Sequence, residues 1–441
     1  MTFYSRMLSV IEILAPALLK ILRKHNFLLN VSMLTAGTVI SQGIIIICQP
    51  ILTRLYTPAD FGVLAVYISA VSIIEMISFC GLKDVSLIPH DNKDAINMLA
   101  ASMLGPILTA LLLTSLILVF PELVVRMIGQ PKFSPYLLLL PAGMLLSATY
   151  KVLQSWETRN KRFYSITQTR LNRAIAGSSA QIMLGFLQIA PLGLMLGYIL
   201  YSGMGSLKFA HNIWKKDHVL FKTISFKNIK RNLIVHRRFL IYTWPDSLLN
   251  IAGIQLPILI IAAAIDKSET GYLMLAMQTM ALPMGIVGSS VSQVYFSEAL
   301  NKLNNRTLGL FTIKTMYMLF RVGSPPLVLL GITAQFIFPL LFGMQWGRAG
   351  IVVMWMTPWF ILQFIASPVS VILFATGNNM LGLFLQLFGF IIRTGIVLIA
   401  TIIAKSWVVE AYALSGAIFY AIYLTMLVVV AKRQDQAYLK V

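Results

Sequence analysis

The sequence predicts an all-α polytopic membrane protein with about twelve transmembrane helices in two groups of six. Of its 441 residues, 58% are hydrophobic and only 11% are charged, whereas a soluble domain carries about 25% charged residues. The chain also contains roughly a dozen apolar runs close to the ~20 residues that a helix needs to cross a bilayer. Its basic residues lie mostly on one side of these runs. The composition therefore excludes an ordinary water-soluble enzyme.

The predicted spans follow one another over most of the chain. The fifth and sixth are separated only by Ala190 and Pro191, so they can be mistaken for one long helix. The twelve spans are predicted at residues 31–53, 61–82, 96–120, 135–153, 174–189, 192–207, 239–265, 271–296, 315–341, 351–375, 380–404 and 408–430.

The basic residues predict the sidedness of the chain. The net charge is +20, from 35 Lys and Arg against 15 Asp and Glu. When the N-terminus is placed in the cytoplasm and the spans alternate, 27 of the 35 basic residues fall on the inner side and six on the outer side. The remaining two, Arg321 and Arg393, lie within spans. Cytoplasmic loops of membrane proteins are rich in Lys and Arg, so both termini are predicted to be cytoplasmic.

The same alternation predicts the domain organisation. The expected parts are an N-terminal cytoplasmic or interfacial segment (1–30), a six-helix lobe (31–207), a basic cytoplasmic linker (208–238), a second six-helix lobe (239–430) and a cytoplasmic tail (431–441). The first part contains an expected interfacial helix over residues 7–22. A faint repeat at the start of each lobe, residues 49–64 and 255–273, supports two halves of like orientation, which is a plan of secondary transporters.

The linker alternates apolar and basic residues at loosely helical spacing. This pattern is typical of a helix that lies on an anionic inner leaflet. Nucleic-acid binding is the competing interpretation, but no folded domain is available to carry it, so no nucleic-acid partner is expected. The apolar residues concerned are Phe221, Ile224, Phe226, Ile229, Leu233 and Ile234.

Motifs of enzymatic chemistry are missing from the sequence. It contains no phosphate-binding GxxxxGK[ST] loop and no GxSxG, HExxH or GxGxxG motif. Its five histidines never pair with cysteine or acid at metal-ligand spacing. Cys48 and Cys80 lie in apolar runs and are expected to be packing residues. We therefore expect a protein that is not an enzyme and that binds no metal or cofactor.

Three arginines are candidates for a cationic lumen. Arg393 lies near the middle of a span with no acid in its own helix, Arg321 lies inside the ninth span, and Arg54 ends the first span. A guanidinium is always charged and forks naturally onto phosphate or carboxylate. An ion pair with another span is the alternative for Arg393, snorkelling to the interface for Arg321, and simple interfacial anchoring for Arg54.

Two acids are candidates for coupling transport to an ion gradient. Glu75 lies in the inner half of the second span and Asp246 in the inner third of the seventh. Ionisable residues inside a membrane commonly face a water-filled pathway. Reversible protonation is one role for these carboxylates, and a fixed ion pair with Arg393 or Arg321 is the other.

Three segments resemble a known family. Residues 49–62 (QPILTRLYTPADFG) are similar to the opening signature of the Wzx-type polysaccharide flippases. Residues 282–296 and 341–350 are also similar, the latter followed by Pro358-Trp359-Phe360 and Pro368. This family belongs to the multidrug/oligosaccharidyl-lipid/polysaccharide (MOP) exporter superfamily, together with multidrug exporters of the MATE type and peptidoglycan lipid flippases.

The resemblance implies a MATE-like fold with two six-helix lobes around a central cavity. It also implies a function, the movement of undecaprenyl-diphosphate-linked oligosaccharides across the bacterial inner membrane for O-antigen (lipopolysaccharide), capsule or exopolysaccharide biosynthesis. Its implied partners are the lipid-linked oligosaccharide, membrane lipids, a polysaccharide polymerase and a chain-length regulator. MATE exporters often carry a coupling acid in the first span. Here that span has none, which leaves Glu75 and Asp246 as candidates for H+ or Na+ coupling.

Two other functions compete with this interpretation. The first is a MATE-like exporter of drugs or small cations, which a cationic lumen disfavours because it would repel such substrates. The second is a membrane polysaccharide polymerase or ligase, which would need a large charged outer loop that the sidedness does not provide.

Overall fold

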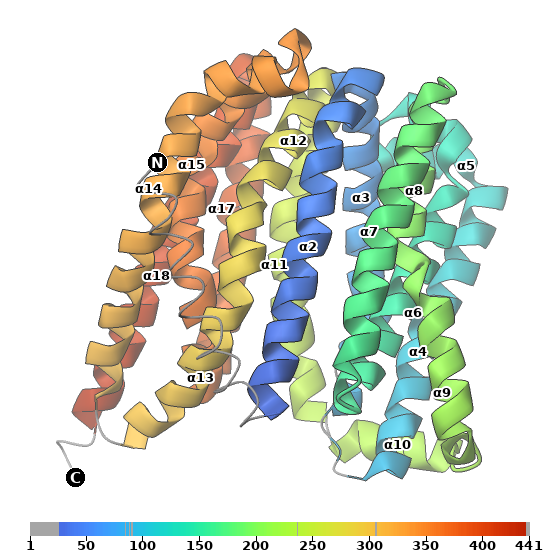
Figure 1. Ribbon diagram of the computed structural model, residues 1–441, viewed down its shortest axis with the longest axis vertical. Coiled ribbons are helices and arrows are strands. Elements are labelled where there is room, and N and C mark those ends of the chain that lie inside the picture. The colour runs from blue at the N-terminus through green and yellow to red at the C-terminus, as the bar shows by residue number, and fades with distance from the viewer. Residues whose placement is uncertain are drawn as a thin grey trace, which may run out of the picture.

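The chain folds into long helices that run roughly parallel to one another. We describe a computed structural model for residues 26–437, except 84, 88, 90, 236, 305 and 306. The interfacial helix expected over residues 7–22 lies outside this part of the chain. Within the described ranges the protein is helical and contains no strand (Figure 1). The predicted all-α polytopic fold is thus confirmed.

A first group of helices occupies the right-hand part of Figure 1, from α2 onwards. Within it, α2 packs on α7 and α7 packs on α8. Helix α6 packs against α3, α4, α8 and α9. The group comprises α2 (Asn26–Leu55), α3 (Pro58–Phe79), α4 (Asn92–Val119), α5 (Pro121–Ile128), α6 (Leu139–Arg159), α7 (Phe163–Phe186), α8 (Leu192–Gly203) and α9 (Gly205–Phe221).

A second group lies to the left of α2 in Figure 1 and follows the short helix α10 (Phe226–Val235). Its main contacts join α14 to α15, α11 to α17 and α15 to α18. The group comprises α11 (Arg237–Ala264), α12 (Lys267–Pro283), the π-helical turn η3 (Met284–Gly288), α13 (Ser289–Asn304), α14 (Leu308–Phe342), the turn η4 (Met344–Trp346), α15 (Gly347–Val369), α16 (Ile372–Ala375), α17 (Asn379–Ile403) and α18 (Val408–Ala437).

We call the end where α2 stops and α3 begins the upper end, and the end where α10 lies the lower end (Figure 1). Eight segments between them are long and apolar enough to cross a membrane. They are Met33–Leu55, Pro58–Phe79, Asn92–Val119, Thr243–Ala264, Leu308–Phe342, Met344–Ala375, Asn379–Ile403 and Lys405–Asp435. The other four predicted spans correspond to α6, to α7, to α8 with α9, and to α12 with α13, which are shorter or more polar.

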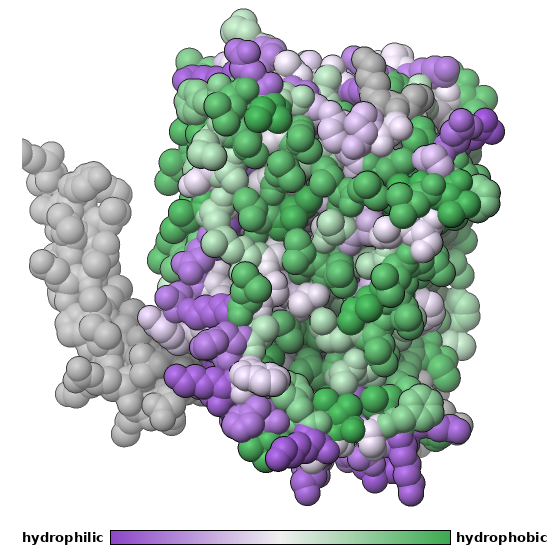
Figure 2. Space-filling model, turned by 90° about the vertical axis from the view of Figure 1, so that its right-hand side faces the viewer, coloured by the Kyte–Doolittle hydropathy of each residue, from purple (hydrophilic) through white to green (hydrophobic). Residues whose placement is uncertain are grey.

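The surface of the helix bundle matches a bilayer. In Figure 2, apolar side chains cover the middle of the visible face, and hydrophilic side chains gather towards its upper and lower ends. On α4, Leu108, Leu112 and Leu118 expose 63%, 69% and 68% of their surface. Such a band of exposed leucines is costly in water and favourable in lipid. The fold is therefore that of a multi-pass membrane protein.

Helix α3 begins with a strong local signal. Thr57 caps the helix, since its side chain accepts a bond from the Asp60 backbone while the Asp60 carboxylate accepts bonds from Thr57. Pro58 occupies the first helical position, where its missing N–H costs nothing. This capping box fixes the turn between α2 and α3 at the upper end.

The two groups of helices touch most closely where α3 meets α12. A Cβ atom added to Gly62 would lie 2.1 Å from the Lys267 carbonyl oxygen, and one added to Gly271 would lie 1.9 Å from the Pro58 carbonyl oxygen. Only glycine allows backbones to approach this closely. The upper end is therefore held together by direct contact between two helix backbones.

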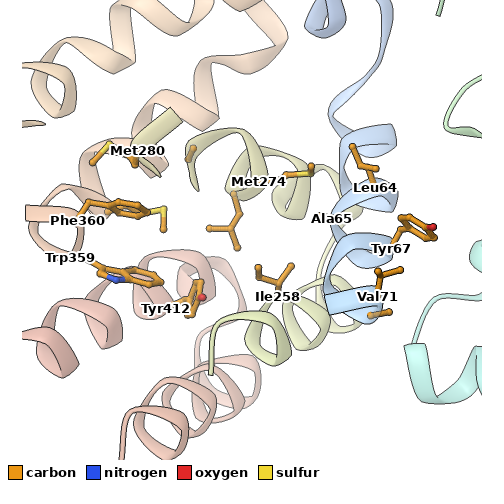
Figure 3. Packing of buried hydrophobic residues seen from close by; sticks show 14 of the residues in the cluster. Leu64, Ala65, Tyr67, Val71, Ile258, Met274, Met280, Trp359, Phe360 and Tyr412 are labelled. Carbon is orange, nitrogen blue, oxygen red and sulfur yellow. The ribbon is translucent and has the colours of Figure 1, made fainter. Parts of the chain in front are cut away.

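One hydrophobic core runs through both groups (Figure 3). Tyr67 on α3 lies on one side, Ile258 and Met274 on α11 and α12 lie in the middle, and Trp359 and Tyr412 on α15 and α18 lie on the other side. All five side chains are buried. The continuity of the core explains why the two groups pack as one body in this conformation.

The largest difference from the predicted spans concerns α6 and α7. Hydropathy placed the end of one span at residue 153 and the start of the next at residue 174, with a basic loop between. In the structure α6 continues to Arg159 and α7 begins at Phe163. Four basic residues assigned to that loop, Lys151, Arg159, Arg170 and Arg173, therefore lie on helices. Hydropathy detects only apolar stretches, and a helix can extend past its apolar stretch with polar residues.

The basic linker forms helices that are attached to α4. Asn97 donates to the Thr223 carbonyl oxygen (3.1 Å) and accepts from the Ser225 backbone N–H (2.9 Å). The Asp94 carboxylate pairs with Arg231 at 2.5 Å. These contacts hold the segment between α9 and α10, and α10 itself, against α4.

Helix α10 buries one side and exposes the other. Ile229 and Leu233 pack against a small cluster on α4, whereas Phe226, Ile234 and Val235 expose 81%, 56% and 67% of their surface. The expected amphipathic linker helix is thus present, with part of its apolar face packed on protein.

The glycine contact between α3 and α12 generates a prediction. In Gly62→Val, the new methyl groups would collide with a backbone carbonyl that cannot move aside, so we expect a destabilisation of about 1–3 kcal/mol. Thermal unfolding of the purified protein would measure it. Gly43→Val is the matched control, because a Cβ at Gly43 has no neighbouring heavy atom within 4 Å. Equal melting temperatures for the two variants would contradict the close contact.

Candidate substrate cavity

A cavity of about 310 Å³ lies between the two groups of helices. Its walls come from α2, α3, α7 and α8 on one side and from α12, η3 and α14 on the other. Among the residues that the structure describes, no Lys, Arg, Asp or Glu lines it. The polar lining consists of Gln42, Gln49, Ser178, Gln181, Tyr198, Tyr201, Gln278 and Thr279.

Above the cavity the two groups are bonded together. The Thr53 carbonyl oxygen, in the last turn of α2, accepts hydrogen bonds from Gln345 Nε2 and Trp346 Nε1, both at 2.9 Å. The buried ring of Trp346 meets Phe61 edge to face, with ring centroids 4.9 Å apart, and meets Tyr272 at 5.9 Å. We call the contacts of Gln345 and Trp346 with Thr53 the upper latch. This latch closes the upper end over the cavity.

A charged cluster braces the helices behind the upper latch. Arg348, at the start of α15, lies 3.2 Å from Glu269 on α12 and 2.6 Å from Glu410 on α18. A second cavity of about 430 Å³ lies beside it. The guanidinium joins two carboxylates from different helices, so α12, α15 and α18 are held in register at this end.

Below the cavity, two arginines lie on the same face of α7. Arg170 donates to Thr38 Oγ1 on α2 at 2.5 Å. The Arg173 guanidinium lies 3.7 Å from the Tyr150 ring centroid and 4.8 Å from that of Tyr201, and its Nε donates to the Tyr201 carbonyl oxygen. Tyr201 also lines the cavity. The positively charged pair therefore precedes, along α7, the residues of this helix that line the cavity, and neither arginine lines the cavity itself.

The predicted lumen residue Arg393 is fully buried inside the second group of helices. Its Nε donates to the Gly389 carbonyl oxygen at 2.9 Å, and its guanidinium carbon lies 4.5 Å from the Phe419 ring centroid. Its two terminal nitrogens have no hydrogen-bond partner among the described residues. Arg393 does not line the central cavity.

The predicted coupling acid Asp246 lines a third cavity, of about 420 Å³, whose walls come from the second group and from Met76 on α3 of the first group. This cavity lies between α11, the region of α16, α17 and α18. Asn250 donates to Gln386 at 3.0 Å across it. Along α17, Gln386 and Arg393 are seven residues apart and thus on one face. The structure therefore places Asp246 and Arg393 in the same lobe, near opposite ends of a polar column.

The other predicted acid, Glu75, is ion-paired. Its carboxylate lies 2.9 Å from Lys151 Nζ and accepts a bond from Ser147 at 3.1 Å. Both partners belong to α6. Of the alternatives that the sequence left open, the fixed ion pair describes Glu75 in this conformation, and its partner is Lys151 rather than Arg393 or Arg321.

The remaining two candidates, Arg54 and Arg321, are exposed and do not line the central cavity. Arg54 lies near the end of α2, one residue after Thr53 of the upper latch. Arg321 lies on α14 beside the exposed Phe320 and Val322. The five predicted residues therefore do not converge on one site.

Sequence reasoning missed Arg170 and Arg173 because it assigned them to a loop. A signal was nevertheless present, since Arg170, Arg173, Gly177 and Gln181 follow the three- and four-residue spacing of one helix face. Extending the helical pattern of residues 174–189 backwards would have placed both arginines on the same face as Gln181.

Comparison with known proteins finds solved structures with a similar fold and one matching protein family. An inward-facing MATE multidrug transporter of the MOP superfamily superposes with a TM-score of 0.71 at 13% identity, covering 90% of this chain and 96% of that one. The lipid II flippase MurJ in an inward closed conformation gives 0.67 at 16% identity, covering 89% and 86%. A MOP superfamily transporter from Pyrococcus furiosus gives 0.57 at 13% identity, covering 90% and 94%. No curated protein sequence matches significantly.

The fold is thus similar to that of solved MOP-superfamily proteins, which confirms the predicted MATE-like architecture. The family of polysaccharide biosynthesis proteins matches residues 51–350. Because this match covers more than half of the chain, the protein belongs to that family.

The upper latch generates a prediction about conformation. Removing a buried tryptophan costs about 3–5 kcal/mol, so Trp346→Ala should let the upper ends of the two groups separate. Spin labels at Glu122→Cys and Lys405→Cys, in a background without Cys48 and Cys80, would report the separation as longer distances by electron resonance.

Trp214→Ala is the control for this experiment, because Trp214 is exposed at the other end of the molecule. An unchanged distance distribution in Trp346→Ala would mean that the latch does not hold the upper end closed.

Proposed function

We propose that this protein is a Wzx-type flippase that moves undecaprenyl-diphosphate-linked oligosaccharide units across the bacterial inner membrane by alternating access. The resulting glycan would serve O-antigen, capsule or exopolysaccharide biosynthesis. The observation that carries the proposal is the central cavity between the two groups of helices, in a chain of the polysaccharide biosynthesis family. The cavity is mainly apolar, carries a set of uncharged polar side chains and is closed at one end. Glutamine, serine, threonine and tyrosine side chains are suited to hydrogen-bond sugar hydroxyls.

The distribution of charge supports an orientation. Lys215, Lys216, Lys222, Lys227 and Lys230 all lie on or beside α9 and α10, at the lower end. By the positive-inside rule the lower end would face the cytoplasm, with both termini on that side. The upper latch would then close the outer side, so the described conformation would receive substrate from the inner leaflet.

The relatives support a lipid-linked substrate rather than a specific glycan. One solved neighbour is a lipid II flippase, and another is a multidrug transporter of the same superfamily. Partnership with a polysaccharide polymerase and a chain-length regulator follows from the proposed pathway. We propose no enzymatic step for this chain, since translocation needs only binding and a change of shape.

Arg54, Arg321 and Arg393 stay candidates for substrate contact in the proposed cycle. None of them lines the central cavity in the described conformation. Their contact with the substrate would therefore occur at the cavity mouth or in a different conformation of the lobes.

Translocation can be tested by complementation. Expression in a bacterium that lacks its own flippase for a known glycan should restore surface polysaccharide, as measured on gels of the extracted glycan. The double variant Gln181→Leu with Gln278→Leu should reduce this signal at least tenfold, because it removes two polar side chains from the cavity. Gln335→Leu is the control, since Gln335 is exposed on α14 and outside the cavity.

Two outcomes would contradict the proposal. The first is failure to restore surface polysaccharide with several glycans while ethidium efflux rises, which would favour a cation exporter. The second is growth of polymer on a substrate that has already been flipped, which would favour a polymerase.

We propose Asp246 as the residue that couples transport to an H+ or Na+ gradient. Its carboxylate lines a cavity and has no ion-pair partner among the described residues, whereas Glu75 is held by Lys151, and Glu269 and Glu410 are held by Arg348. Asp246→Asn should lower surface polysaccharide at least tenfold and remove the sensitivity of translocation to gradient collapse. Asp266→Asn is the control, because Asp266 is exposed at the upper end of α12. Normal, gradient-dependent translocation by Asp246→Asn would refute this role.

A further inference from the structure

We propose that the hydrogen bond between Gln49 and Gln278 senses the glycan in the central cavity, and that it recognises the acetamido group of an N-acetylated sugar. We call this hydrogen bond the glutamine bridge. The inference rests on the proposed function and deepens it. It names the part of the substrate that is recognised and the contact through which the presence of substrate reaches the upper latch.

The glutamine bridge joins the two lobes inside the cavity. Gln49 Nε2 on α2 donates to Gln278 Oε1 on α12 at 3.1 Å, and both side chains line the cavity. Among the described residues that line the cavity, no other pair is hydrogen-bonded from one lobe to the other. A substrate that enters the cavity therefore meets a direct bond between the lobes.

The glutamine bridge lies near the upper end of the cavity. On α2, Gln49 is one turn below Thr53, whose carbonyl oxygen accepts the hydrogen bonds of the upper latch. On α12, Gln278 is seven residues, or ~10 Å along the helix axis, below Gly271, where α12 meets α3. Residues seven positions apart lie on one helix face. A displacement of either glutamine would therefore act on the segments that hold the upper end closed.

Helix α12 is able to adapt close to the glutamine bridge. Five residues after Gln278 the helix ends at Pro283 and continues as the π-helical turn η3. Proline removes a backbone hydrogen bond, and π-helical turns are frequent at functional sites. A Cβ added to Gly285, which lines the cavity, would have no heavy atom within 4 Å. The turn thus has free space into which it can move when Gln278 changes its partner.

The bridge occupies only half of each amide. Gln49 Oε1 and Gln278 Nε2 have no hydrogen-bond partner among the described residues. Gln181, on the wall formed by α7, donates through Nε2 to the Leu194 carbonyl oxygen at 3.1 Å, and its Oε1 stays available as an acceptor. A ligand with both a donor and an acceptor can therefore replace the bridge and gain further bonds.

An acetamido group fits this lining. Its carbonyl oxygen can accept from Gln49 and its N–H can donate to Gln278, so both partners of the bridge find a new one. Its methyl group can be buried against the apolar part of the lining, which includes Leu52, Leu282 and Phe342. A hydroxyl group offers the same polar atoms and no methyl group. A carboxylate would lose its hydration without meeting a cation among the described lining residues.

The purified full-length protein in lipid nanodiscs tests this inference with two probes. The first is undecaprenyl diphosphate carrying N-acetylglucosamine, and the second is the same lipid carrying glucose, which has a hydroxyl in place of the acetamido group. The wild-type protein should bind the first probe at least fivefold more tightly. With spin labels at Glu122→Cys and Lys405→Cys, the first probe should also raise the population of long distances at least threefold.

Two variants test the bridge itself. Gln49→Met and Gln278→Met keep the approximate size of the side chain and remove the hydrogen bond. Each should raise the population of long distances without any probe and lower the preference for the acetamido sugar to less than twofold. Since either substitution breaks the bridge, the double variant should open no further than the single variants. Gln335→Met is the control, because Gln335 is exposed on α14 and outside the cavity.

The possible failures are distinguishable. A wild-type protein that binds neither undecaprenyl diphosphate lipid would overturn the proposed function itself. Equal affinity for the two probes would overturn recognition of the acetamido group. Additive effects of the two substitutions, or distances that do not change with the first probe, would overturn the glutamine bridge as the sensor. The comparison of the two probes needs no variant, so it decides the inference even where a methionine variant does not fold.

Discussion

The contact between α3 and α12 is the constraint on which the other features of this molecule depend. Gly62 and Gly271 let the two backbones meet at the upper end, and the upper latch adds two hydrogen bonds to one carbonyl group beside them. Since each helix belongs to a different group, this contact decides how the lobes sit relative to each other. The cavity lies below this contact, so opening the cavity towards the upper end would require the contact to break.

The ion pairs of the described residues lie within each lobe rather than between the lobes. Within lipid, a charged side chain needs a partner or a water-filled space. Glu75 with Lys151 and the Arg348 cluster meet the first requirement, and each joins helices of a single lobe. These pairs strengthen the lobes individually and leave the interface between them to uncharged groups. Gln49 and Gln278, for example, meet across the interface through one hydrogen bond of 3.1 Å. Such hydrogen bonds between the lobes can break without separating an ion pair.

The all-α membrane fold could be predicted from the sequence, whereas the residues that line the cavity could not. Long apolar runs and the excess of basic residues on one side are one-dimensional signals, so the helices, their order and the turn at Ala190-Pro191 could be predicted. The site depends on which face of each helix turns inward, and hydropathy does not contain that information in a chain whose outer surface is as apolar as its core. Arg393 was correctly placed within a helix, but only the structure reveals that it points into its own lobe.

The buried position of Arg393 can be explained by polar residues of the same lobe. It has no carboxylate at ion-pair distance among the described residues, yet the polar column from Asp246 through Asn250 and Gln386 leads towards it. Gly253 lies beside the guanidinium, since a Cβ added to it would lie 3.1 Å from an Arg393 terminal nitrogen. It is seven residues above Asp246 on α11, or ~10 Å along the helix axis. At that distance and an effective dielectric constant of about 20, the two charges would attract by ~1–2 kcal/mol.

An attraction of ~1–2 kcal/mol is too weak to hold the lobe in a single conformation. It is large enough for the charge state of Asp246 to affect the helices around Arg393. Neutralising Asp246, by a proton or by a bound cation, would remove the attraction and leave Arg393 as an uncompensated buried charge. The helices that enclose Arg393, α11, α17 and α18, would then gain from a rearrangement that brings water or an anion to its free nitrogens. Helix α11 also contacts α3 of the other lobe, where Ser69 donates to Gln255 at 2.8 Å. In the proposed cycle, a change of charge at Asp246 would therefore have a short physical route to the interface between the lobes.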